Sequence, residues 1–96
     1  MPYVLIHKHD RRIYGSMLIN VYKIPYYGAK YWDSLEEGKA EAQTFLEARN
    51  ETAPGDWELL EVEEDRLKLF NVKFANNPNR LVRLEEDGRV VGYTMP

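Results

Sequence analysis

The chain has 96 residues, of which 44% are hydrophobic, and a formal net charge of −3. This length corresponds to one domain, and the hydrophobic share is enough for a core, which excludes a disordered acidic tail. The absence of cysteine excludes disulfides, thiolate nucleophiles and cysteine-bound zinc. The first residues lack the layout of a signal peptide, and no run has the length of a membrane-spanning helix. We therefore expect a cytoplasmic protein without membrane attachment.

The N-terminal third predicts β-structure. Residues 3–9 form a short β-rich run, His9–Arg12 form a turn, and residues 13–24 alternate apolar and polar side chains. Two such strands form an antiparallel hairpin. We expect Pro25–Gly28 to end the second strand, because proline cannot donate to a strand ladder and Gly28 permits a turn. The alternation puts four side chains on one apolar face: Ile13, Met17, Ile19 and Val21.

One helix is predicted over residues 34–49. Ser34 and Glu37 form a capping box at its start. Gly38 lies on the apolar face, where the small residue favours close approach of the helix backbone to a sheet. Residues 52–55, Thr-Ala-Pro-Gly, forbid continuation of the helix. The other members of the apolar face follow helical spacing: Leu35, Ala42, Phe45 and Leu46.

The remainder of the chain is predicted as strands. Residues 57–63 and 67–74 pair across a turn at Glu64–Asp65, with Phe70, Val72 and Phe74 on one face. Residues 75–79 form a loop, and residues 81–85 and 89–95 flank Asp87–Gly88, a strong hairpin signal. The element order is then ββαββββ. We expect a single α+β domain over residues 1–96, with one helix on a mainly antiparallel sheet, which is either one curved sheet or two packed sheets.

No catalytic signature is present. His7 and His9 share one face of a strand and precede Asp10, so a metal-dependent or small-molecule enzyme at these histidines is one hypothesis. Any further ligand would be one of many acids, and two polar residues at a strand end are the simpler interpretation. The two serines, Ser16 and Ser34, lack a nucleophile context. We expect a non-enzymatic protein with no metal and no cofactor.

Aromatic residues concentrate just before the helix. Five lie within eleven residues, together with Lys23 and Lys30. Trp32 directly precedes the helix cap, so we expect it to pack beneath the helix. Exposed tyrosines are typical of protein interfaces, and aromatics among cations also stack nucleic-acid bases. We expect Tyr26–Gly28 to form an exposed tip. The five aromatics are Tyr22, Tyr26, Tyr27, Tyr31 and Trp32.

Charge is segregated along the chain. Residues 33–65 contain twelve carboxylates and two cations, a net charge of −10, whereas residues 1–32 carry +4 and residues 66–96 carry +3. Glu36, Glu37, Glu41 and Glu47 decorate the helix side opposite its apolar face. Glu37 and Glu41 repel each other at a cost of a few tenths of a kcal/mol. An acidic surface of this kind can meet a basic groove on a partner, including a groove that normally receives nucleic acid.

The favoured hypothesis is a protein-binding module, a small regulator or inhibitor of the type that phages and mobile elements encode. Its partner would be another protein with a basic surface, and its site would comprise Tyr26, Tyr27, Tyr31, Glu37, Glu41 and Glu47. The alternative is a nucleic-acid-binding domain that uses Arg11, Arg12, Lys23 and Lys30 with the tyrosines. Whether an exposed edge strand pairs two copies into a homodimer is left open.

Overall fold

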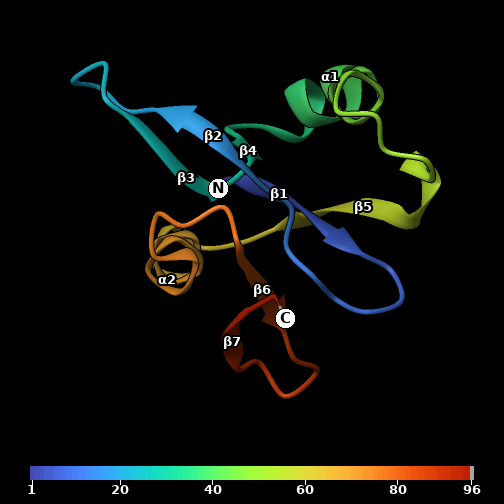
Figure 1. Ribbon diagram of the computed structural model, residues 1–96. Helices are drawn as coiled ribbons and strands as arrows, with labels where there is room; N and C mark the ends of the chain where they lie inside the picture. The colour runs from blue at the N-terminus through green and yellow to red at the C-terminus, as the bar shows by residue number, and fades with distance from the viewer. Residues whose placement is uncertain (96) are drawn as a thin grey trace.

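The computed structural model describes residues 1–95 and contains seven strands, two α-helices and one short 3-10 helix (Figure 1). The N-terminal strands are β1 (Tyr3–His7), β2 (Gly15–Ile19), β3 (Pro25–Ala29) and β4 (Tyr31–Trp32). Helix α1 (Leu35–Ala48) and the 3-10 helix (Pro54–Asp56) precede β5 (Trp57–Glu61). Helix α2 (Glu64–Phe74) and the strands β6 (Arg80–Leu84) and β7 (Val90–Thr94) complete the chain. The predicted α+β class is confirmed. Neither helix of this described part is long and apolar enough to cross a membrane.

The strands form three small antiparallel sheets instead of the one or two that we expected. The largest has the order β4-β1-β5, and the others are the β2–β3 and β6–β7 hairpins. Residues 11–13 connect these units, because the amide of Ile13 donates to the carbonyl of Val82 and that of Leu84 donates to Arg11. The β6–β7 hairpin, which turns at Asp87–Gly88, confirms the predicted C-terminal hairpin.

The central strand β1 divides the hydrophobic core in two, because successive side chains of a strand point to opposite faces. Val4 and Ile6 belong to the large core, which α2 covers, and Leu5 belongs to the small core, which α1 covers (Figure 1). The large core comprises Val4, Ile6, Ile13, Ala29, Val62, Leu67, Phe70, Phe74, Val82 and Val90. The small core comprises Leu5, Trp32, Leu46 and Trp57.

Helix α1 forms where the sequence predicts it. The Ser34 hydroxyl accepts a hydrogen bond from the Glu37 amide at 3.2 Å, as expected for the helix cap. Gly38 is buried against Leu59, whose side chain lies 2.9 Å from where a Cβ would be, so the predicted close approach to the sheet is confirmed. Leu46 is the α1 side chain that is buried in the small core. Leu35, which was expected on the packed face, is exposed.

Residues 67–74, which we predicted as a strand, belong to helix α2. The alternation of Phe70, Val72 and Phe74 suggested a strand, but Val72 is exposed while Phe70 and Phe74 are buried with Leu67. The spacing that matters is Leu67, Phe70 and Phe74, which is one helical face. Glu64 and Asp65 are therefore not a turn between strands. They form the first helical turn, where acidic side chains suit the helix dipole.

The predicted pairing of the first two strands is also wrong in part. Residues 3–9 and 13–24 meet at only one bridge, Ile6 with Ile13, and β2 pairs with β3 instead. Asn20 breaks the expected strand, because its side-chain oxygen accepts the amides of Tyr22 and Ile24 and closes a loop. Pro25 therefore begins a strand instead of ending one.

Candidate functional site

A hollow of about 310 Å³ lies between the first turns of α1 and the β2–β3 hairpin. It brings together four of the six residues that the sequence suggested for a partner interface, namely Tyr26, Tyr31, Glu37 and Glu41. We call it the Tyr–Glu hollow. The rest of its lining consists of Leu18, Ile19, Lys30, Trp32 and Asp33.

Local structure explains how these side chains converge. Tyr26 lies opposite Leu18 in the β2–β3 ladder, so both point to the face of the hairpin that meets the hollow. Tyr31 follows in β4. Glu37 and Glu41 are one helical turn apart on α1, and both are exposed. Burial, with a smaller contribution from Tyr31, raises the pKa of Tyr26, so its hydroxyl stays protonated at neutral pH and can donate a hydrogen bond.

The hollow has an acidic rim. Asp33, Glu37 and Glu41 line it, and within residues 1–95 none of them takes part in an ion pair. The single cation, Lys30, is held over aromatic rings, with its ammonium 4.9 Å from the centre of Trp32. The rim therefore has carboxylates free to bind cations, above a floor of aromatic and aliphatic side chains.

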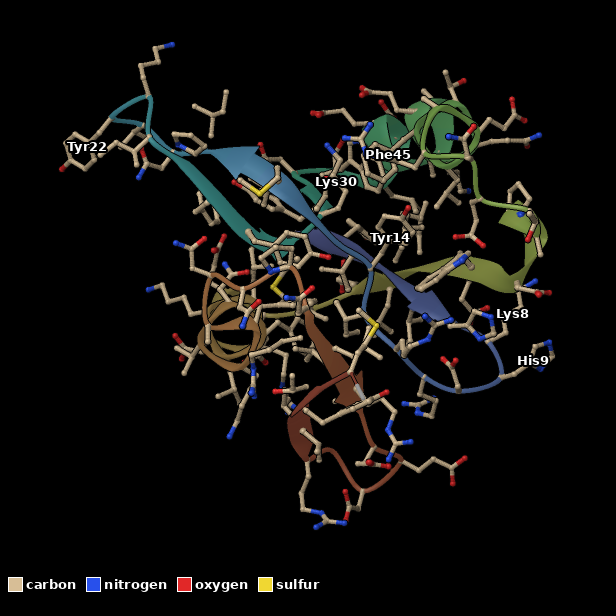
Figure 2. All side chains as sticks on the ribbon, viewed as in Figure 1. Lys8, His9, Tyr14, Tyr22, Lys30 and Phe45 are labelled. Carbon is tan, nitrogen blue, oxygen red and sulfur yellow. The ribbon has the colours of Figure 1, made fainter. Side chains whose placement is uncertain are left out.

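Tyr27 and Glu47, the other two expected interface residues, lie elsewhere. Tyr27 follows Tyr26 in β3 and points to the opposite face, where its half-buried ring packs 5.5 Å from that of Phe74. Burial raises the pKa of Tyr27. Glu47 accepts a hydrogen bond from Gln43 near the end of α1. Residues 26–28 are thus inside a strand, and the expectation that they form an exposed tip is wrong. The tip is at residues 21–23, as Tyr22 shows in Figure 2.

The four cations of the nucleic-acid hypothesis do not converge. Arg11 donates to the carbonyl of Leu84 at 2.7 Å, and Lys23 lies in the loop of the β2–β3 hairpin. Arg12 and Lys30 lie on the side of the sheet that α1 covers. The guanidinium of Arg12 pairs with the carboxylate of Asp10 at 2.7 Å and stacks over the ring of Trp57 in the small core.

A cationic and aromatic surface that the sequence analysis missed adjoins Lys30. Tyr14 and Phe45 meet edge to face at 5.5 Å between ring centres, and Figure 2 shows them beside Lys30. The guanidinium of Arg49 lies 4.5 Å from the ring centre of Phe45. The spacing of Phe45 and Arg49, one helical turn apart, was the available signal. We call Tyr14, Lys30, Phe45 and Arg49 the basic–aromatic face.

His7 stabilises a turn, and the exposed His9 side chain lies 3.8 Å from Asp56. Nδ1 of His7 accepts the backbone amides of His9 and Asp10 at 3.2 and 3.3 Å. Nδ1 also lies 3.3 Å from a carboxylate oxygen of Asp10, and Nε2 faces Asp56 at 4.0 Å. A metal ion on Nε2 would require the neutral ring to carry its single proton on Nδ1, which already faces two amide donors. In the described part of the chain, no group of three potential ligands is arranged to hold a metal.

A second hollow, of about 1020 Å³, lies between α2 and the β6–β7 hairpin. Acidic and basic side chains line it in similar numbers. Two of its arginines already bind the backbone, Arg66 at the carbonyl of Gly88 and Arg11 at that of Leu84. This hollow therefore lacks the excess of acidic side chains and the aromatic floor of the Tyr–Glu hollow.

Comparison with known proteins finds no matching family model, no matching curated protein and no matching solved structure. The geometry described above is therefore the basis for a proposed function.

Proposed function

We propose that the protein is a non-enzymatic binding module that engages a basic surface of another protein through the Tyr–Glu hollow. The observation that carries this proposal is the convergence of Tyr26 and Tyr31 with Glu37 and Glu41 around one concavity. Consecutive elements, β3, β4 and α1, supply both an aromatic floor and an acidic rim. Interfaces of this kind pair a few buried aromatic anchors with a charged rim.

The two kinds of residue have separate roles in the proposed complex. Glu37 and Glu41 are exposed, so they attract a lysine or arginine of the partner and mainly raise the association rate. Tyr26 and Tyr31 are partly buried, and Tyr31 also packs against the large core, so they bind at low entropic cost and mainly slow dissociation. A partner segment with a cationic group beside an apolar side chain would contact both the acidic rim and the aromatic floor.

Regulation or inhibition of the partner would follow from occupation of its basic surface. Residues 33–65, which include α1, carry a net charge of −10. The part of this charge on α1, four glutamates against Lys39, can compete with polyanions for a basic groove. The proposed role is therefore that of a small regulator or inhibitor.

The test compares two variants that remove equal charge from the same helix. Glu37→Gln/Glu41→Gln changes the rim of the hollow, and Glu36→Gln/Glu47→Gln changes α1 outside the hollow. The immobilised wild-type protein captures its partner from native lysate, mass spectrometry identifies it, and surface-binding kinetics follow at several salt concentrations. We expect the rim variant to associate more slowly, with a flatter salt dependence, and the control to change much less. Equal rates in the two variants would contradict the assignment of the hollow.

The aromatic floor has its own test. Tyr31→Ala should speed dissociation of the same partner, at a cost on the order of 2 kcal/mol, and leave association nearly unchanged. Tyr3→Ala is the control, since the Tyr3 hydroxyl binds Glu61 away from the hollow. If both variants dissociate like the wild type, the tyrosines are not anchors.

Nucleic-acid binding is the second candidate, and the basic–aromatic face favours it. Lys30 and Arg49 flank the ring of Phe45, and within residues 1–95 neither takes part in an ion pair. Cations beside an aromatic ring suit a phosphate and a stacked base. Fluorescence anisotropy with a labelled single-stranded oligonucleotide tests this candidate. Binding that falls linearly with salt on a log–log plot and is lost in Lys30→Ala/Arg49→Ala would favour it over the first proposal.

A further inference from the structure

The two edges of the β2–β3 hairpin differ. At the outer edge of β3, the backbone amides of Tyr27 and Ala29 donate to the side-chain oxygens of Asn76 and Asn71, at 2.7 and 2.9 Å. These two asparagines lie in and just after α2, and they occupy the hydrogen-bonding positions that another strand would use. Natural proteins protect edge strands in this way against unwanted pairing.

The outer edge of β2 has less cover: the Met17 carbonyl accepts a hydrogen bond from the neighbouring Ser16 hydroxyl at 3.4 Å, and Arg49 donates to that hydroxyl. The alternation of hydrogen bonds with β3 directs the backbone groups of Met17 and Ile19 outward, because their partners in the ladder, Tyr27 and Pro25, also direct theirs outward. Within residues 1–95, β3 is the only strand bonded to β2. The hairpin also projects from the body of the protein (Figure 1), so this edge is accessible.

The sequence of this edge lacks the usual protection. Residues 13–22, Ile-Tyr-Gly-Ser-Met-Leu-Ile-Asn-Val-Tyr, contain no charged residue in a chain that is 30% charged. They also contain no proline. Exposed edge strands of monomeric proteins ordinarily have charges, especially lysine, or proline for this purpose. An identical uncharged strand can therefore approach without repulsion between like charges.

The apolar area is also of the right size. Met17, Ile19, Val21 and Tyr22 are 55%, 69%, 87% and 79% exposed. Together these side chains supply an apolar patch on the order of 500 Å², two of them from β2 and two from the turn that follows it. A stable interface buries about 800 Å² per partner, somewhat more than half of it apolar. The exposed apolar area of the hairpin is therefore comparable to the apolar area that one partner buries in a stable interface.

We propose that two copies of this chain form a homodimer through antiparallel pairing of β2 with β2 about a twofold axis at Leu18. Met17 of each copy then lies opposite Ile19 of the other, and the two outward-facing residues exchange backbone hydrogen bonds. The two hairpins join into one four-stranded sheet with the order β3-β2-β2-β3. The pairing is isologous, so it closes at two copies.

Analytical ultracentrifugation over about 1 µM to 1 mM protein tests the dimer. The variant Ile19→Lys puts a lysine into the proposed interface from each copy, and Val72→Lys is the matched control on α2, because Val72 is also 69% exposed. We expect the wild type and Val72→Lys to reach twice the monomer mass. Ile19→Lys should remain a monomer, which corresponds to at least a tenfold loss in the association constant of the dimer. Its thermal melt should be unchanged. A monomeric wild type, or equal behaviour of the two variants, would overturn the proposal.

Cross-linking tests the register. The chain has no cysteine, so Leu18→Cys carries a single thiol. Residues directly opposite in a pair that is not hydrogen-bonded have Cα atoms about 4.5 Å apart, within reach of a disulfide. We expect mild oxidation to link Leu18→Cys into a covalent dimer, and Val72→Cys to stay largely monomeric. Equal yields for the two thiols would reject the twofold axis at Leu18.

Discussion

The two sides of the β4-β1-β5 sheet differ in the number and the type of their buried side chains. The side that α2 covers contains ten buried residues, including two phenylalanines with no more than 1% exposure. The side that α1 covers contains four, two of which are tryptophans with cations stacked on their rings. The large core therefore contributes most of the hydrophobic stabilisation. The small core fixes α1 with little buried area and leaves its acidic face to solvent, where it is available for binding.

The largest expected effect is in the large core. Phe70 is fully buried, so Phe70→Ala should lower the free energy of unfolding by about 3–5 kcal/mol. A loss of this size is comparable to the whole stability of many small domains. Urea denaturation followed by circular dichroism measures it, with Val72→Ala on the exposed face of the same helix as the control. If Phe70→Ala costs less than 1 kcal/mol, the large core is not the main source of stability.

The matching change in the small core should cost less. Leu46 is 2% exposed and is the most buried side chain of α1, so Leu46→Ala should lower stability by about 2–3 kcal/mol. Phe45 is only partly buried, so Phe45→Ala should cost less than Leu46→Ala. The same denaturation experiment ranks the variants. A loss for Leu46→Ala greater than that for Phe70→Ala would reverse the comparison between the two sides.

The helix caps provide a smaller effect. Ser34 caps α1 through its hydroxyl, whereas Glu63 at the start of α2 makes no side-chain cap bond. Ser34→Ala should cost about 1 kcal/mol, and Glu63→Ala should cost much less. Denaturation midpoints of the two variants provide the measurement. Equal losses would show that the two helices depend on their first turns to the same extent.

The smallest effect concerns the turn beside the small core. Asp10 is partly desolvated, which opposes ionisation, but hydrogen bonds from the Arg12 amide and guanidinium outweigh this and lower the pKa of Asp10 below 3.8. Its stabilisation is therefore complete above pH 4 and is lost as pH falls through the lowered pKa. Because the carboxylate is 42% exposed, Asp10→Asn should cost less than about 1 kcal/mol at pH 7. Melting curves from pH 7 to about pH 2 should converge for the variant and the wild type at the acidic end. A constant difference across this range would exclude the ion pair as its cause.

Local signals explain which helix was predicted. Helix α1 begins with the Ser34–Glu37 capping box and acidic residues, and these act within one turn of the chain. Residues 67–74 fit both a strand period and a helix period, so their sequence alone did not decide between the two. The acids at residues 63–65 and Lys73 near the end were the helix signals available. Phe70 and Phe74 decide in favour of a helix because together they fill the large core.

The candidate site was likewise predicted in part by the sequence and decided in part by the fold. The sequence predicted Tyr26, Tyr31, Glu37 and Glu41 as interface residues, and the structure places these four around one hollow. Tyr27 was grouped with Tyr26, although adjacent residues of a strand face opposite sides. This error followed from reading residues 26–28 as a turn. The role of Asn20, whose side chain ends β2 and moves the turn to residues 21–23, depends on hydrogen bonds that no periodicity reveals.

The sequence by itself determined the α+β class, helix α1 with its cap, the C-terminal hairpin and the segregation of charge. Each of these depends on interactions between residues close in the chain. Only the tertiary structure decided that residues 64–74 are helical, that β2 pairs with β3, and that tyrosines of β3 and β4 meet glutamates of α1 in one hollow. The first and last of these features depend on packing between elements, and the β2–β3 pairing depends on the hydrogen bonds of the Asn20 side chain. These interactions exceed the weak preferences of helix and strand that a sequence displays.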